Sequence, residues 1–403
     1  MNYKSPYIKI YLRITALLLI VGIFFSNAVL QISTGLFLPF IIYLAIKKGK
    51  ESELRSIEKL ILLLLLSGIL SLFFSPMPSL AYKNIIRHCI LLTIIPILYM
   101  ADNDDFISIN VIGKLVSVFA LITATYGIIR YLNGAERAFG FFAGYYTLSA
   151  ILAFSLPITF ASIFYSKNYW KYLAGISTFI QAAALWLTFT RSALLGIVIG
   201  SLVIIIFLLF GGNISKQVRN KIILMSTLSL TLIIILLFTT TDARINPIKI
   251  FSNTDISSGR NEVYNDAYNT MVTDLKFGWQ NILFGHGLNS RVILFPSSHY
   301  TSWESEYIES LMTQGLIGLL LVILIYYQFF KNLINLLLRS SNSIYRIFSL
   351  GILVSGISFG IISFFSSQLL GQNSSAYFVV LYSLIILIER KIKDKSSQIS
   401  SKN

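Results

Sequence analysis

Arg191 is the charged residue in this sequence that is best placed to do chemistry. It interrupts a long apolar stretch within residues 187–193. A charged side chain in apolar surroundings is costly unless it has a function. Its planar guanidinium could bind a phosphate group through two hydrogen bonds. The alternative is an arginine that ends a helix and reaches the membrane surface without a ligand.

Three further arginines could add positive charge to the same site. Arg137 lies in the short segment 134–140, and Arg260 and Arg291 lie in a long polar segment after residue 240. For Arg137, the alternative is a solvated loop residue paired with Glu136. Several guanidinium groups together bind phosphate oxygens strongly. The sequence therefore predicts a phosphate-binding set formed by Arg137, Arg191, Arg260 and Arg291.

Residues 298–310 could supply a proton acceptor. This stretch contains His299 and the carboxylates of Glu304, Glu306 and Glu309, just before an apolar run. A carboxylate or an imidazole at the edge of water can take a proton from a hydroxyl group. We expect Glu309 to lie deepest if a helix begins near Glu306. The alternative is an ordinary helix start, because the helix dipole favours acidic residues in a first turn.

Two arrangements resemble metal sites only weakly. Asp102-Asn103-Asp104 has the carboxylate spacing of metal-dependent nucleotide-sugar transferases, but so short a motif is unspecific. His286 and His299 lie near glutamates, but two histidines without a fixed separation are also a weak metal motif. We therefore predict a site without a metal ion or another cofactor.

The elements that must position these groups are membrane helices. Of the 403 residues, 55% are hydrophobic and 12% are charged, and the mean hydropathy is +0.75. Soluble domains carry about 25% charged residues. Apolar runs that could cross a hydrocarbon core of roughly 30 Å recur along the chain, without the alternation of barrel strands. The sequence predicts an all-α polytopic membrane protein.

We predict about twelve transmembrane helices. They cover residues 8–26, 29–46, 59–75, 85–100, 111–131, 141–165, 172–190, 193–211, 222–239, 306–330, 346–366 and 374–390. The predicted divisions of the chain are helices 1 to 9 (1–239), a large periplasmic loop (240–305), helices 10 to 12 (306–390) and a cytoplasmic tail (391–403).

The basic residues predict the orientation of these helices. The net charge is +15, and most of the 32 Lys and Arg residues gather in alternate loops and in the tail. Because basic loops stay in the cytoplasm, both termini are predicted to be cytoplasmic. Lys4, Lys9 and Arg13 before the first apolar run would also fit a signal peptide, but removing that run would upset the pattern. The basic residues do not form one cluster, which argues against a nucleic-acid-binding protein.

The long loop after the ninth helix is predicted to be folded. Segments of this length are usually functional or disordered. Apolar residues recur here at helical spacing, which predicts a surface helix near the membrane interface. Residues 285–287, Gly-His-Gly, predict a tight turn. The apolar residues of the predicted helix are Tyr264, Ala267, Tyr268, Met271 and Leu275.

Four segments resemble those of the O-antigen ligase and polymerase superfamily, and they occur in the family's order. Segment 137–142 resembles Arg-x-x-Gly-x-Phe, 188–193 resembles Thr-x-Ser-Arg-Gly, and 258–287 resembles the loop helix with its closing glycine turn. The ligase motif is a His-Asn/Ser/Gln pair, nine residues and Gly-x-x-Gly. Here Ser305 and residues 315–318 match it, and Glu304 stands where a ligase has histidine. This departure favours a repeat-unit polymerase.

The resemblance implies a metal-independent, inverting glycosyltransferase of the bacterial inner membrane with a periplasmic active site. It implies undecaprenyl-pyrophosphate-linked glycans as donor and acceptor, contact with membrane lipids, and a chain-length regulator protein as a further partner. Arg191, with Arg137 and Arg260, would stabilise the departing pyrophosphate. Glu304 would accept the proton, with His299 or Glu306 as substitutes.

Two alternatives of other kinds stay open. A ligase would transfer finished polymer to lipid A–core. A flippase or other transporter would hold its polar groups inside the bundle near the membrane midplane. Here the polar groups gather in loops, which favours chemistry at the membrane surface.

Overall fold

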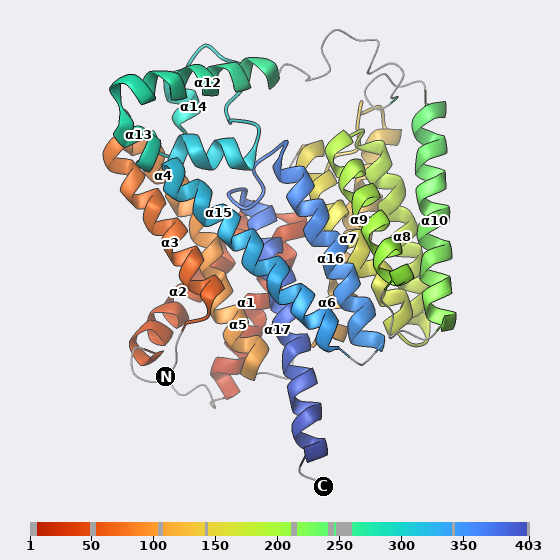
Figure 1. Cartoon of the computed structure of the whole chain (residues 1–403). Helices are drawn as coiled ribbons and strands as arrows, with labels where there is room; N and C mark the ends of the chain where they lie inside the picture. The colour runs from red at the N-terminus through yellow and green to blue at the C-terminus, as the bar shows by residue number, and fades with distance from the viewer. Residues whose placement is uncertain are drawn as a thin grey trace.

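The structure is a computed structural model that describes residues 6–48, 54–103, 108–141, 144–210, 216–240, 246, 260–340 and 343–400. Throughout these ranges the regular elements are helices, and no strand occurs among them. The predicted all-α membrane fold is therefore confirmed. Figure 1 shows long helices side by side, with a group of shorter helices across one end of the bundle.

The helices of the first part of the chain follow the predicted spans. They are α1 (Pro6–Phe25), α2 (Asn27–Lys48), α3 (Ser56–Leu70) continued by η1 (Ser71–Phe74), α4 (Pro78–His88), η2 (Cys89–Thr93), α5 (Ile94–Asn103), α6 (Ile109–Leu132), α7 (Tyr145–Tyr165), α8 (Tyr169–Leu187), α9 (Arg191–Phe210) and α10 (Lys216–Thr239). The rest of the chain forms α12 (Arg260–Phe277), α13 (Trp279–Phe284), α14 (Ser290–Leu294), α15 (Glu306–Arg339), α16 (Ser343–Ser363) and α17 (Gln372–Ser400).

Ten helical segments in the described ranges are long and apolar enough to cross a membrane. Helices α8 and α17 coincide with the predicted spans 172–190 and 374–390 but are not among these ten. The total of twelve therefore stays a prediction. The predicted span 85–100 is less regular than expected, because α4, η2 and α5 follow one another there.

Small residues, glycine and serine, allow the central helices to approach closely. α16 is the most enclosed of the ten segments, with 83% of its span buried, and it packs against α7 and α9. A Cβ atom at Gly196 of α9 would lie 2.9 Å from Ser358 Cα of α16. A Cβ atom at Gly351 of α16 would lie 2.9 Å from the Pro157 carbonyl oxygen of α7. Small residues at such crossings are typical of membrane helix packing.

A buried amide joins α7 to α8. Gln181 is fully buried, and its side-chain oxygen accepts a hydrogen bond from Ser155 Oγ at 2.9 Å. Its amide nitrogen donates to Thr159 Oγ1 at 3.0 Å and to Ser177 Oγ at 2.9 Å. Buried polar groups are stable when they are fully hydrogen-bonded. Gln181 and Ser177 of α8 therefore face the interior of the protein.

The short helices lie at the end of the bundle that is opposite to the start of α1 and the end of α17 (Figure 1). Helix α12 confirms the predicted loop helix. Its buried side contains Val263 and Ala267, whereas Tyr268 and Leu275 are exposed. The apolar stripe expected from the sequence is thus narrower than predicted. Residues 241–245 and 247–259 of the predicted loop, with Ser258 and Gly259, lie outside the described residues.

Two glycine motifs form a joint between these short helices and α15. Helix α15 is interrupted at Gly315, where φ is 71°. The turn after α13 lies against this break: the His286 N–H donates to the Met312 carbonyl at 2.9 Å, and the Gly287 N–H donates to the Thr313 carbonyl at 3.0 Å. Both Gly285 and Gly287 have positive φ, so the predicted tight turn is confirmed. The break supplies carbonyl acceptors that a continuous helix would use itself.

Candidate functional site

Arg191 lies in a sharp turn between helices α8 and α9. Helix α8 ends at Leu187, and Arg191 is the first residue of α9. Thr188 and Thr190 are buried in the turn, and Thr188 Oγ1 donates to the Leu185 carbonyl at 2.7 Å. Phe189 has a φ of 50°, which is strained for an aromatic residue. The fold therefore holds Arg191 in a constrained position at a helix N-terminus.

The loop that carries Arg137 is docked onto this turn. The N–H of Ala138 donates to the carbonyl of Leu187 at 2.9 Å. Phe139 lies under the Arg130 guanidinium, 4.3 Å from ring centroid to Cζ. Phe141 stacks on Tyr126 with 4.0 Å between the ring centroids. These contacts fix residues 133–141, so the Arg137 loop and the Arg191 turn lie side by side.

A continuous row of side chains leads from Arg137 to the loop before α15. Arg137 Cζ lies 4.1 Å from the ring centroid of Tyr145, and the rings of Tyr145 and Tyr146 are 4.5 Å apart. Arg260 Nη2 donates to the Tyr146 hydroxyl at 3.2 Å, and Arg260 Nε lies 3.6 Å from Glu304 Oε2. We call these five residues the cation–tyrosine row. It brings together three residues that the sequence placed in one site, from segments more than a hundred positions apart.

Glu304 has a strained backbone. Its φ is 52°, although the neighbouring residues Trp303 and Ser305 are both buried and hold the chain in place. Its second carboxylate oxygen accepts a hydrogen bond from Ser302 Oγ at 2.8 Å. In the described part of the chain, positive φ outside glycine occurs at two asparagines, which tolerate it, and at Phe189 and Glu304. The two unexpected positions are thus Phe189, two residues before Arg191, and Glu304, the predicted base.

Tyr264 of α12 lies near both charges at this end of the row. Burial raises the pKa of Tyr264 above its usual value; the Arg260 guanidinium lowers that pKa and the Glu304 carboxylate raises it. Because Tyr264 keeps its proton at neutral pH, it adds a neutral aromatic wall beside the Arg260–Glu304 pair.

Arg291 has a different environment from the other predicted arginines. Its side chain is 1% exposed, and Nη1 lies 2.7 Å from Asp266 Oδ2. Its Cζ lies 4.6 Å from the Phe295 ring and 5.0 Å from the Trp303 ring. Arg291 Nη2 also donates to Ser298 Oγ at 3.0 Å. Arg291 therefore lies inside the group of short helices, away from the cation–tyrosine row.

Glu306 and Glu309 also hold the backbone. Glu306 is fully buried, and its carboxylate accepts the N–H groups of Gln368, Leu369 (2.9 Å) and Leu370 (3.3 Å). Glu309 Oε2 accepts the N–H of Trp303 at 2.9 Å. The expectation that Glu309 lies deepest is wrong, because Glu309 turns back towards the loop and Glu306 points into the interior. Glu306 therefore anchors the loop before α17.

The histidines do not converge in the described structure. His299 is exposed on the loop before α15. His286 is buried, and its Nε2 lies 2.7 Å from Asp274 Oδ2. Within the described ranges, no group of three or more His, Cys, Asp or Glu side chains is arranged to hold a metal ion. Asp102 pairs with Arg55, and Asp104 lies outside the described residues.

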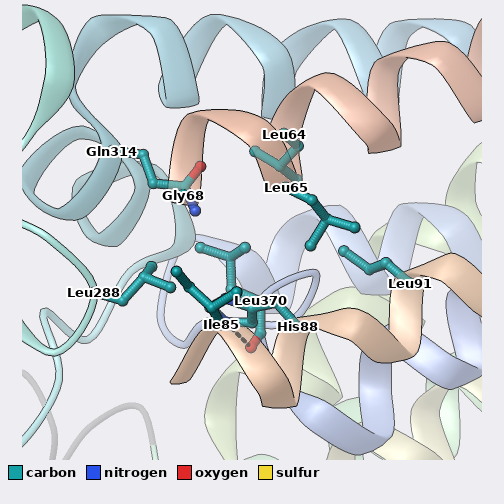
Figure 2. A pocket seen from close by; sticks show the side chains of 9 residues that line it. All are labelled: Leu64, Leu65, Gly68, Ile85, His88, Leu91, Leu288, Gln314 and Leu370. Carbon is teal, nitrogen blue, oxygen red and sulfur yellow. Dashed lines mark hydrogen bonds between the residues drawn. The ribbon is translucent and has the colours of Figure 1, made fainter. Parts of the chain in front are cut away.

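A small cavity lies beside the glycine joint rather than at the row. Figure 2 shows that the Gln314 amide and the His88 ring reach its wall, where His88 Nε2 lies 3.0 Å from the Leu370 carbonyl. Its volume is about 10 Å³, room for roughly one water molecule. None of the predicted site residues lines it. The row is instead open at the end of the bundle, where Tyr146 is 41% exposed.

Sequence reasoning missed the two tyrosines of the row. Tyr145 and Tyr146 follow Gly144 at the start of α7, and tyrosines at the ends of membrane helices are common. Because such tyrosines are common, their position at a helix end did not by itself indicate a role in the site. The available sign was their position directly after the Arg137 segment, at a helix start on the predicted outer side.

Residues 176–323 match the family described as O-antigen ligase. This match supports the resemblance of the chain to the O-antigen ligase and polymerase superfamily. The match supports an O-antigen ligase- or polymerase-type function, that of a glycosyltransferase-like membrane enzyme. The matched range contains Arg191, Arg260 and Glu304, while Arg137 and the two tyrosines lie before it. No curated protein sequence matches the chain.

Proposed function

We propose that this enzyme polymerises undecaprenyl-pyrophosphate-linked repeat units on the periplasmic face of the bacterial inner membrane. The observation that carries the proposal is the convergence of the Arg191 turn, the Arg137 loop and Glu304 at one end of the bundle, with backbone strain at both Phe189 and Glu304. Strained residues persist where the surrounding structure enforces them, often at active sites.

The donor half of the site would lie at Arg191 and Arg137. Arg191 begins α9, and Arg137 lies beside the start of α7. The N-termini of both helices therefore add positive potential to the two guanidinium groups. This combination suits a pyrophosphate whose negative charge grows as it leaves. Such electrostatic stabilisation is typically worth about 3 to 4 kcal/mol for one donor group.

The reaction would be a direct displacement. The oxygen of an acceptor hydroxyl attacks the anomeric carbon of the donor sugar, and the bond from that carbon to the pyrophosphate oxygen breaks. The hydroxyl proton passes to the Glu304 carboxylate, and undecaprenyl pyrophosphate leaves with the electron pair, next to Arg191 and Arg137. One displacement inverts the anomeric configuration. All the protein groups that act in these steps are side chains of this chain. We propose that no metal ion takes part.

The test is a reconstituted assay with a defined lipid-linked repeat unit. Wild type is expected to extend the chain, and Arg191→Ala is expected to leave single repeats unextended. In cells, Arg191→Ala should let single-repeat lipid intermediates accumulate. Normal chain lengths from that variant would contradict the donor assignment. The matched control is Arg390→Ala at the opposite end of the bundle, which should extend chains normally.

The base is tested by a pair of substitutions. Glu304→Gln removes the proton acceptor and should lower turnover by at least about 10²-fold. Glu304→His restores a proton acceptor at the position where ligases have histidine, so it should retain more activity than Glu304→Gln. Equal activity in the two variants would exclude Glu304 as the base.

Ligation is the second candidate, because the family that matches residues 176–323 is described as O-antigen ligase. A ligase would transfer finished polymer to lipid A–core. The two functions differ in what accumulates when the protein is lost: a missing polymerase leaves single repeats on the carrier, and a missing ligase leaves long chains on it. Long carrier-bound chains in a deletion strain would favour the ligase.

A further inference from the structure

We propose that the Arg260–Glu304 pair and the ring of Tyr146 form the subsite for the acceptor sugar. This inference rests on the proposed function and adds Arg260 and Tyr146 to its acceptor side. Arg260 was predicted from the sequence as a pyrophosphate ligand, whereas its contacts in the structure assign it to the acceptor hydroxyl.

The Arg260–Glu304 ion pair has an open geometry. Arg260 Nε and Glu304 Oε2 are 3.6 Å apart, too far for a hydrogen bond. Arg260 Nε is buried, and it has no hydrogen-bond partner among the described residues. A buried N–H without an acceptor is costly. An oxygen atom of a ligand that enters between the two groups would supply the missing acceptor.

The two charges of the pair restrict the chemistry of a group that binds between them. The group must accept a hydrogen bond from Arg260 and donate one to Glu304. A hydroxyl does both, whereas a phosphate at neutral pH mainly accepts and would be repelled by the carboxylate. A sugar hydroxyl in this position would have its proton directed at the proposed base. The carboxylate therefore favours an acceptor hydroxyl over a pyrophosphate at Arg260.

An aromatic surface lies next to the pair. Tyr146 is 41% exposed, and its hydroxyl is held by Arg260 at 3.2 Å. The face of an aromatic ring carries partial negative charge and attracts the polarised C–H groups of a sugar ring. Tyr145 lies on the far side, covered by Arg137 at 4.1 Å. Along the row, Arg137 on the donor side is thus followed by the two tyrosine rings and then by the Arg260–Glu304 pair on the acceptor side.

The experiment separates the two substrates. The donor is the lipid-linked repeat unit in proteoliposomes. The acceptor is a soluble glycoside of the same repeat unit that lacks the pyrophosphate, and transfer of one repeat to it is measured. We expect Arg260→Ala and Tyr146→Ala to raise the KM for the glycoside roughly 10- to 100-fold and to leave the donor KM unchanged. Tyr146→Phe keeps the ring and should have a smaller effect.

Two controls define the result. Arg191→Ala should impair use of the donor without changing the KM for the glycoside. Tyr268→Ala removes an exposed tyrosine of α12 outside the row and should behave as wild type. If Arg260→Ala raises the donor KM and leaves the glycoside KM unchanged, Arg260 is a pyrophosphate ligand and the inference fails.

Failure of the proposed function gives a different result. If wild type transfers no sugar at all, equilibrium binding of the glycoside to the reconstituted protein tests the subsite by itself. Binding that is lost in Arg260→Ala and Tyr146→Ala would support the subsite in a protein of another activity. No binding to wild type would overturn it.

Discussion

Arg260 and Arg291 belong to the same loop and the same residue type, yet the structure gives them opposite environments. Arg260 begins α12, is 15% exposed, and lies 3.6 Å from a single carboxylate. Arg291 is 1% exposed, has Asp266 at 2.7 Å, and lies between two aromatic rings. Arg260 keeps part of its side chain exposed, whereas Arg291 is enclosed by protein groups.

The difference shows what a buried arginine requires. Removing a charge from water costs several kcal/mol, which a close carboxylate and hydrogen bonds must offset. Arg291 has Asp266 and Ser298 in that role, and it supports the segment that contains Trp303. Arg260 has a looser pair and an open side, as expected for a residue that binds a substrate.

The largest expected effect is on folding, in Arg291→Ala. The substitution leaves the Asp266 carboxylate without its partner beside a buried ring cluster. Breaking a buried pair costs about 3 to 5 kcal/mol. We expect a large fall in the yield of folded protein and in its melting temperature, measured in detergent. A variant as stable as wild type would show that Arg291 is not a structural residue.

Arg260→Ala should show the reverse pattern. In this variant, transfer of a repeat unit to a glycoside acceptor should fall roughly 10- to 100-fold. This change corresponds to one lost hydrogen bond to a charged group. The melting temperature should stay close to that of wild type, because the Arg260 pair is loose. A loss of stability equal to that of Arg291→Ala would remove the distinction between the two arginines.

Gly315→Ala tests the joint that supports both arginines. The added Cβ would lie 2.2 Å from the Leu283 carbonyl oxygen, at a φ of 71°. We expect a loss of about 2 kcal/mol in unfolding free energy, because an alanine is strained there. Gly360→Ala in α16 is the matched control, since no atom lies within 4 Å of its Cβ position. Equal stability of the two variants would contradict the joint.

The smallest expected effect concerns the backbone of Glu304. Glu304→Gly removes the side chain at a φ of 52°, a conformation that glycine adopts without strain. We expect unfolding free energy to rise by about 1 kcal/mol while glycan transfer is lost. This combination, measured by melting temperature and by the transfer assay, would identify strain that is kept for function. A stability loss would indicate that the side chain mainly supports the fold.

The sequence predicted the parts of this fold that depend on local pattern. Apolar runs gave the membrane helices, the spacing around Ala267 gave α12, and the Gly285–Gly287 turn was recognised from glycine alone. The interruption of α15 at Gly315 was recognised only as a motif. Its reason, a turn that uses the carbonyls of Met312 and Thr313, depends on contacts between segments far apart in the chain.

For the site, the sequence by itself determined which residues carry charge and that they fall in loops outside the apolar runs, because burial in lipid forbids unpaired charges. Only the tertiary structure decided which charges meet. It joined Arg137 to Glu304 through Tyr145, Tyr146 and Arg260, buried Arg291 beside Asp266, and turned Glu306 to the backbone of residues 368–370. The physical reason is that a charged side chain takes its role from its partners, and partners from distant segments are set by packing.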